Sequence, residues 1–324
     1  MNKQQFKPAW WLKNSHLQTI WPVLARKSVK NLPLERERLE LPDGDFMDLD
    51  WMGRSETGQP LVIVLHGFEG SIESHYAKTM LRELRGKGWR GVFMHFRGCS
   101  GEPNRLARGY HSGETADLDF LVKVLTQREP NTPMAAIGYS LGGNVLLKWL
   151  GETSGANPLQ AAIAISVPFE LHKAAARIQT GFSRFYQWYF LKCLRRRLMD
   201  KFKYIQSSID LAVLGGARTI RDFDNAYTAP LHGFQNADHY YTVSSSRQYL
   251  KNITVPTLLV HAKDDPFMTA DVLPEAHELS PAVTLELSET GGHVGFVTGR
   301  YPWKPEYWLE KRVPQFLMAK FAGE

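Results

Sequence analysis

AAIGYSLGGNVLLK, residues 135–148, is the stretch of sequence that decides the fold of this chain. It ends an apolar run in a turn that presents Ser140 between two glycines, the G-x-S-x-G pattern of a nucleophile elbow. Such a sharp turn closes only where the residues two positions on either side of the serine have almost no side chain. Residues 134–137 fit a short buried strand, and residues 144–150 begin an apolar-periodic helix. This context predicts a serine presented between a strand and a helix.

Strands and helices alternate on both sides of this turn. Residues 34–41 and 45–51 alternate polar and apolar side chains around a Pro-Asp-Gly turn, which predicts an antiparallel hairpin. Further buried strands are expected at 61–65, 91–96, 161–165, 257–261 and 283–287, and further helices at 74–85, 115–127 and 305–321. This alternation favours right-handed crossovers and therefore predicts the α/β class, with a mostly parallel twisted sheet flanked by helices.

Between residues 168 and 252 the alternation stops, and the chain becomes helical, basic and aromatic. We expect this segment to be a helical cap inserted into one α/β core, which residues 1–167 and 253–324 form together. The core begins with an aromatic segment, residues 1–30. Its tryptophans either pack on the body of the protein or form a hydrophobic lip, and packing is the favoured interpretation.

The composition is typical of a globular protein, with 43% hydrophobic and 22% charged residues. The two cysteines, Cys99 and Cys193, form no C-x-x-C pair, which argues against a disulfide framework and a cysteine-ligated zinc ion. The sequence shows neither the apolar core of a signal peptide nor the roughly 18 apolar residues of a spanning helix. We therefore expect a cytoplasmic protein, with peripheral membrane contact left open.

Positive charge is concentrated in the predicted cap. Residues 171–205 contain nine basic residues and one acidic residue, whereas the whole chain has a formal net charge of +6. Residues 182–203 add many aromatic side chains. Three interpretations stay open: a cap with its apolar faces toward a cleft, a surface that contacts a membrane or anionic lipid, and nucleic-acid binding. The last is disfavoured because no nucleic-acid reader motif accompanies the charge.

A serine hydroxyl becomes a useful nucleophile when a base lies within hydrogen-bond reach and another group orients that base. His293 lies just after the predicted strand 283–287, next to glycines that let a loop carry the ring over the sheet. Asp264 and Asp265 follow the predicted strand 257–261. The order serine, acid, histidine is one known order of a serine triad. We favour Asp265 as the acid because proline follows it on the turn, and Asp264 is the alternative.

The oxyanion that forms when a serine attacks a carbonyl needs hydrogen-bond donors that are already in place. One predicted donor is the backbone N–H of Leu141, directly after the serine and at the N-terminus of the helix. The second is the backbone N–H of Phe68, in the loop after strand 61–65. We interpret His66 as a structural residue that holds this loop.

Four blocks of the sequence point to one family: WLKNSHLQT at 11–19, HGFEG at 66–70, FRGCSG at 96–101 and YHSGET at 110–115. Over nearly its whole length the chain resembles the α/β-hydrolase superfamily and, more narrowly, the YheT-like esterases related to the eukaryotic abhydrolase-domain proteins. The resemblance implies an α/β-hydrolase fold. It also implies hydrolysis of carboxylic esters, of short or medium chain or of lipid type, through an acyl-enzyme. Ser140, Asp265 and His293 occupy the matching triad positions.

Two other functions use the same scaffold. An acyltransferase would use the same triad, and a lipid- or ligand-binding protein could keep the fold without turnover. Some eukaryotic relatives carry an H-x-x-x-x-D motif linked to acyl transfer, but none of the eleven histidines here has an aspartate five positions later. Arg97 and Asn104 are expected to shape the loop 97–112 at the carboxyl ends of the strands, where ligands bind in open α/β sheets.

A metal cluster is the remaining candidate site. His111, Glu114 and Asp117 could be taken for ligands, but Thr115 and Asp117 fit N-terminal capping of the helix that follows. A serine triad requires no metal. The sequence therefore predicts neither a metal nor a cofactor, and the expected partner is a small-molecule or lipid ester.

Overall fold

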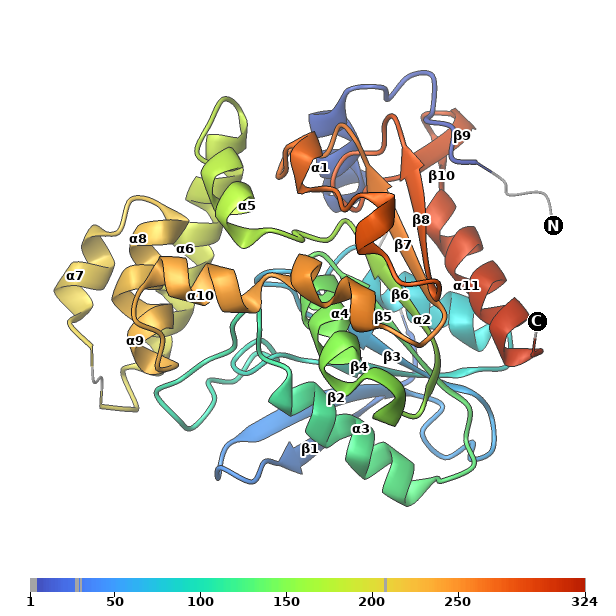
Figure 1. Ribbon diagram of the computed structural model, residues 1–324, viewed down its shortest axis with the longest axis horizontal. Helices are drawn as coiled ribbons and strands as arrows, with labels where there is room; N and C mark the ends of the chain where they lie inside the picture. Colours follow the sequence, from blue (N-terminus) through green and yellow to red (C-terminus); the bar gives the residue numbers. More distant parts are fainter. Residues whose placement is uncertain (1–4, 27–28, 30, 207–208, 324) are drawn as a thin grey trace.

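The computed structural model describes residues 5–26, 29, 31–206 and 209–323. The other residues of the predicted core and cap, 1–4, 27–28, 30, 207–208 and 324, lie outside the described residues. An eight-stranded sheet with the order β1-β2-β4-β3-β5-β6-β7-β8 runs through the molecule (Figure 1). Its strands are β1 Leu34–Glu40, β2 Phe46–Met52, β3 Leu61–Leu65, β4 Arg90–Met94, β5 Met134–Tyr139, β6 Leu159–Ile165, β7 Thr257–Ala262 and β8 Val283–Ser288.

Six of these strands, β3 to β8, are parallel to their neighbours, and the β1–β2 hairpin joins β4 in antiparallel fashion. Every residue of β3, β4 and β5 is buried. Helices on both faces of a parallel sheet cause this burial, which is why these strands are mostly apolar. The predicted mostly parallel sheet and the predicted hairpin are confirmed.

Two layers of helices sandwich the sheet (Figure 1). Ile63 and Val64, successive residues of β3, point into different layers because side chains alternate along a strand. One layer contains the apolar side chains of α3 and α4, and the other those of α2 and α11. These helices span α2 Ala77–Arg85, α3 Ala116–Arg128, α4 Leu141–Thr153 and α11 Trp308–Phe321.

The C-terminal helix begins three residues later than predicted. Residues 304–307 form the strand β10 (Lys304–Tyr307) instead, which pairs antiparallel with β9 (Val297–Tyr301) in a separate two-stranded sheet. Proline is tolerated in such a strand because the pair has two open edges, where a missing N–H breaks no ladder. The helix predicted from residue 74 also begins three residues later, at Ala77.

The regular elements described between β6 and β7 are all helical. They are α5 Leu171–Arg177, α6 Ser183–Lys201, α7 Leu211–Gly216, α8 Ile220–Phe223, the π-helix η2 Asp224–Thr228, α9 Ala229–Leu231, α10 Ala237–Ser244 and the 3-10 helix η3 Ser246–Asn252. Most of this segment projects from one end of the sheet, at the left of Figure 1. We call residues 168–252 the helical insertion. The division of the chain into a core and a cap at these boundaries stays a prediction.

The N-terminal segment packs on the body of the protein and also reaches its surface. Ala9 and Leu12 are buried in one cluster with Val297. The helix α1 (Ser15–Ala25) follows, and its end exposes Leu24. Of the tryptophans, Trp11 and Trp21 pack against this cluster, as the favoured interpretation predicts, whereas Trp10 is 68% exposed. In the described parts of the chain, no helix has the length and apolar character needed to cross a membrane.

Candidate active site

Ser140 lies in the turn between β5 and α4 and adopts a backbone conformation that is rare for a serine. Its φ is +51° and its ψ is −118°, and its N–H donates to the carbonyl of Ile165 at 2.8 Å. The turn needs its glycines. A Cβ on Gly138 would lie 2.5 Å from the carbonyl oxygen of Gly142, and one on Gly142 would lie 2.5 Å from that of His66. Both positions therefore require glycine, because backbone segments approach each other closely in this turn.

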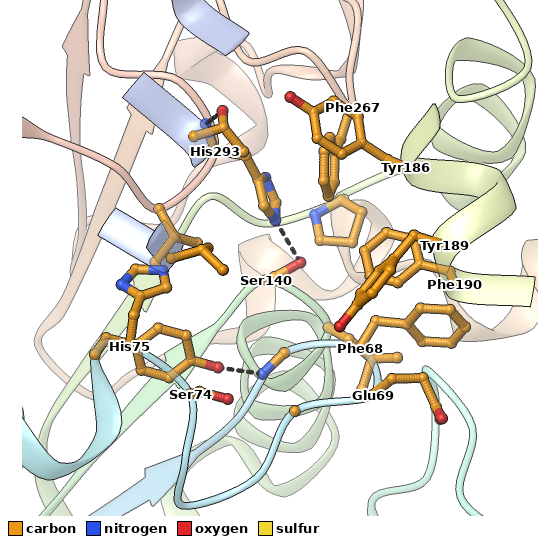
Figure 2. A pocket seen from close by; sticks show the side chains of 18 of the residues that line it. Phe68, Glu69, Ser74, His75, Ser140, Tyr186, Tyr189, Phe190, Phe267 and His293 are labelled. Carbon is orange, nitrogen blue, oxygen red and sulfur yellow. Dashed lines mark hydrogen bonds between the residues drawn. The ribbon is translucent and has the colours of Figure 1, made fainter. Parts of the chain in front are cut away.

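His293 lies between a serine and a carboxylate. Its Nε2 is 2.9 Å from Oγ of Ser140 (Figure 2). Its Nδ1 is 2.8 Å from Oδ2 of Asp265. The carboxylate accepts from the Nδ1–H, which leaves Nε2 as the acceptor for the serine hydroxyl. Asp264 forms no hydrogen bond to either ring nitrogen. Its Oδ1 instead accepts from the N–H of Gly292 at 3.0 Å. The structure thus brings Ser140, Asp265 and His293 together and leaves Asp264 beside them.

Three contacts hold the imidazole in place. The backbone N–H of His293 donates to Oγ1 of Thr19 at 2.9 Å, and the next N–H, of Val294, donates to Oγ of Ser166 at 3.0 Å. The ring of Phe267 stacks on the imidazole with 4.1 Å between centroids. Thr19 is not among the site residues that the sequence patterns predict. Its one available signal was the block at 11–19.

The loop after β3 lies against the serine. A Cβ on Gly67 would lie 3.2 Å from Cβ of Ser140. His66 fixes this loop as predicted: its Nδ1–H donates to the carbonyl of Gly67 at 2.7 Å, and its Nε2 accepts from the N–H of Phe96 at 3.1 Å. Burial lowers the pKa of His66 to about 3, so the ring is neutral.

Two backbone N–H groups in this region are unused. Among the described residues, no acceptor pairs with the N–H of Phe68 or with that of Leu141, the first residue of α4. The neighbours of Phe68 are both bound, since the Gly67 N–H donates to Tyr76 Oη at 2.8 Å and the Glu69 N–H donates to Tyr110 Oη at 2.9 Å. Of these three successive N–H groups, only that of Phe68 is therefore free to donate to a ligand.

A cavity of about 950 Å³ opens beside Ser140. This volume is within the range of small-molecule sites. The helices α1, α5 and α6 contribute apolar lining side chains, among them Val23, Leu171, Ala175, Phe185 and Phe190. His75 lines another part of the wall (Figure 2). The cavity is therefore mainly apolar and has a serine in its wall.

Arg97 and Asn104 lie outside this cavity and shape the loop after β4, as predicted. Arg97 is buried and binds both carboxylate oxygens of Asp117, at 2.8 and 2.6 Å. Asn104 donates from Nδ2 to Oδ2 of Asp45 at 2.6 Å. These contacts join the loop to the β1–β2 hairpin and to α3.

Thr115 is the N-cap residue of α3 and Asp117 lies in the first turn, as predicted, but no side-chain capping hydrogen bond forms. The Asp117 carboxylate faces Arg97, because a bidentate charge-assisted pair is stronger than a bond to a backbone N–H. Thr115 donates to Oε2 of Glu152 at 2.7 Å instead. No group of three or more His, Cys, Asp or Glu side chains in the described ranges could hold a metal ion.

Comparison with known proteins adds the family context. A family model described as alpha/beta hydrolase fold matches residues 60–300. The chain is 44% identical to "Putative esterase YheT" of Escherichia coli (strain K12), over 97% of this chain and 93% of that protein. It is 29% identical to "Phospholipase ABHD3" of Mus musculus, over 98% of this chain and 79% of that protein. A solved structure of the esterase Pf2001 of Pyrococcus furiosus covers 91% of this chain and 95% of its own, with a TM-score of 0.57 and 21% identity, which shows a shared fold.

Proposed function

The chain belongs to the α/β-hydrolase fold family, and from this premise we propose that it is a serine hydrolase that cleaves carboxylic esters. One observation carries the proposal: a single imidazole bridges Oγ of Ser140 at 2.9 Å and Oδ2 of Asp265 at 2.8 Å. The printed names of relatives, an esterase and a phospholipase, support an ester as the substrate.

In the proposed reaction, Ser140 Oγ attacks the ester carbonyl carbon while His293 Nε2 takes the hydroxyl proton. The N–H groups of Phe68 and Leu141 bind the oxyanion, and each such donor is typically worth about 3 kcal/mol in the transition state. The imidazolium then returns its proton to the leaving alcohol, and an acyl-enzyme forms. Water then attacks the acyl carbonyl while His293 Nε2 takes its proton, and the bond to Ser140 Oγ breaks as the imidazolium returns the proton to Oγ. The carboxylic acid leaves and Ser140 is regenerated. Asp265 orients the imidazole and stabilises its charged form.

The cavity supports a medium-chain or lipid-type acyl group. Its volume of about 950 Å³ exceeds the need of a short acyl chain, and helices of the insertion supply apolar walls. A long chain placed along these walls would leave water, at a gain of about 0.8 kcal/mol for each buried CH₂ group. We expect activity to rise with acyl length until the chain fills the cavity.

An acyltransferase and a ligand-binding protein without turnover are the alternatives on this scaffold. Acyl transfer is separated from hydrolysis by adding glycerol or a long-chain alcohol and measuring the new ester. A protein without turnover would release no p-nitrophenol.

We place the protein in the cytoplasm, and the two free cysteines, Cys99 and Cys193, are consistent with a reducing compartment.

We also propose peripheral contact with a lipid surface through α6. Phe182, Phe185, Trp188 and Tyr189 are each more than half exposed at the start of this helix, and Phe185 and Tyr189 line the cavity. Aromatic side chains favour the membrane interface, and basic residues on the same helix attract anionic lipids. Not every basic residue of the predicted segment 182–203 belongs to this surface, because Lys201 is buried.

The first test is active-site labelling. A fluorophosphonate probe is expected to label the protein, and Ser140→Ala is expected to abolish the label. Ser55→Ala, a change at an exposed loop serine, is the matched control and keeps it. A panel of p-nitrophenyl esters of increasing chain length then measures turnover. Labelling that persists in Ser140→Ala would remove this serine from its proposed role.

The second test addresses the lipid surface. Co-sedimentation with phosphatidylcholine vesicles that contain phosphatidylglycerol is expected to weaken in Trp188→Ser. Trp303→Ser is the control, because Trp303 is 80% exposed on the β9–β10 hairpin, away from α6. Equal loss in both variants, or no loss in Trp188→Ser, would count against docking through α6.

A further inference from the structure

Helix α6 contacts two successive residues of the loop that holds the proposed oxyanion donor. The ring of Phe190 meets the ring of Phe68 edge to face, with 5.3 Å between centroids (Figure 2). About two turns further along the helix, Arg197 binds both carboxylate oxygens of Glu69. Nη2 lies 2.9 Å from Oε1, and Nε donates to Oε2 at 3.2 Å. The insertion therefore contacts both the residue that carries the donor, Phe68, and the residue that follows it, Glu69.

Glu69 adopts a strained backbone conformation that its surroundings maintain. Its φ is +52°, which is uncommon for a residue other than glycine. The hydroxyl of Tyr110 accepts from its N–H at 2.9 Å and donates to its Oε1 at 2.8 Å. The guanidinium of Arg197 lies 5.0 Å from the centroid of the same tyrosine ring. Strain of this kind persists only where several contacts hold it, and here the contacts come from the insertion and from the loop after β4.

The positive charge of Arg197 also acts on the carboxylate of Glu69. The Glu69 side chain is only 7% exposed, and the residue lines the cavity that also contains Ser140. An unpaired carboxylate there would repel the oxyanion that forms nearby, because a low dielectric strengthens interactions between like charges. The bidentate pair with Arg197 neutralises the carboxylate.

We propose that Arg197 is a positioning residue for ester hydrolysis: it holds and neutralises Glu69 so that the N–H of Phe68 meets the oxyanion. This inference rests on the proposed function. It gives one arginine of the Arg195-Arg196-Arg197 run a role inside the protein rather than on a basic surface. The insertion, through α6, thereby supports the stabilisation of the transition state.

The test compares Arg197→Met with wild type on a soluble p-nitrophenyl ester. We expect kcat to fall by about tenfold to hundredfold, somewhat less than for complete loss of an oxyanion donor, with little change in KM. The affinity for a trifluoromethyl ketone, which forms a tetrahedral adduct with the serine, is expected to fall by the same factor. Arg221→Met is the matched control, since the ion pair of Arg221 with Asp238 is half-exposed on the same insertion. It is expected to behave as wild type.

A double variant distinguishes the proposed effects of Arg197, through positioning and through charge, from a general loss of structure. Glu69→Gln added to Arg197→Met removes the unpaired carboxylate and is expected to recover part of the lost kcat. If Arg197→Met does not fold, Arg197→Lys carries the test, with a kcat below that of wild type because one ammonium cannot hold both oxygens. Wild-type kcat and inhibitor affinity in these Arg197 variants, or no recovery in the double variant, would overturn the inference. A wild-type protein inactive on all esters would instead overturn the proposed function.

Discussion

Unusual backbone conformations gather around Ser140 at the scale of single residues. Seven non-glycine residues in the described chain have a positive φ, and five lie in loops of the candidate site: Glu69, Ser140, Ser166, Val294 and Phe296. A positive φ in a β-branched residue such as Val294 is costly, so the fold must supply compensating contacts. Strain concentrated in this way is typical of a functional site.

Replacement of the two neighbouring aspartates tests the residue assignment. Asp265→Asn is expected to lower kcat by about a thousandfold to ten-thousandfold, because the amide no longer favours the tautomer that accepts the serine proton. Asp264→Asn is the matched control, and its effect is expected to be far smaller, since an amide oxygen can still accept from the N–H of Gly292. Steady-state kinetics on a p-nitrophenyl ester measures both. Similar losses in the two variants would contradict the assignment of Asp265.

At the scale of one element, the end of β3 is joined to the end of β4 by a buried histidine. His66 bonds the backbone of its own loop and that of Phe96, and its ring stacks on Phe93 with 5.7 Å between centroids. Both nitrogens are used in the neutral form, one as donor and one as acceptor. A proton on Nε2 would break the bond from Phe96. The loop that carries the N–H of Phe68 therefore depends on a neutral His66.

Acid should destabilise the protein through this residue. The pKa of His66 is about 3 in the folded chain and near 6.5 in the unfolded chain, so only the unfolded chain takes up this proton between these values. The free energy of unfolding therefore falls, as the pH decreases from 6.5 toward 3, by about 1.4 kcal/mol per pH unit from this group. Urea unfolding at several pH values is expected to show a shallower decrease for His66→Gln than for wild type. His277→Gln, at an exposed histidine, is the control, and a decrease in His66→Gln as steep as in wild type would contradict the prediction.

At the scale of the whole molecule, the two ends of the chain meet at the histidine loop. Gln18 in α1 accepts from the N–H of Val297 at 2.7 Å and donates to its carbonyl at 3.0 Å, as a neighbouring strand would. The packing is so close that a Cβ on Gly295 would lie 2.2 Å from the carbonyl oxygen of Gln18. The N-terminal helix α1 thus packs against the loop of His293 and helps to position it.

Thr19→Val tests this long-range contact with almost no change in shape. The substitution leaves the buried N–H of His293 without its acceptor, which is expected to lower the free energy of unfolding by about 1–3 kcal/mol. It is also expected to lower kcat severalfold because the imidazole is held less firmly. Thermal unfolding and ester kinetics measure the two effects. Thr126→Val is the control, since Thr126 donates to a carbonyl within α3, and equal effects in both variants would contradict a special role for Thr19.

Much of the fold follows from local patterns along the chain. Apolar runs of five or six residues between helical segments predict parallel strands, and the glycines around Ser140 predict the turn. Because these strands are parallel, the loops after β3, β5, β7 and β8 lie at one edge of the sheet. Ser140, His293 and the two aspartates could therefore be selected from the sequence, because each follows a strand.

Tertiary structure alone decided which partner each side chain takes. Arg197 and Lys201 look like surface charge in the sequence, but Arg197 pairs with Glu69 and Lys201 is buried. Asp117 looks like a helix cap but binds Arg97, and Thr19 supports a histidine that lies 274 residues away in the sequence. Periodicity and turn propensity report only on neighbours in the chain. Partners of buried charges and free N–H groups are chosen among all groups that folding brings near, because a buried polar group left alone costs more free energy than a local preference can recover.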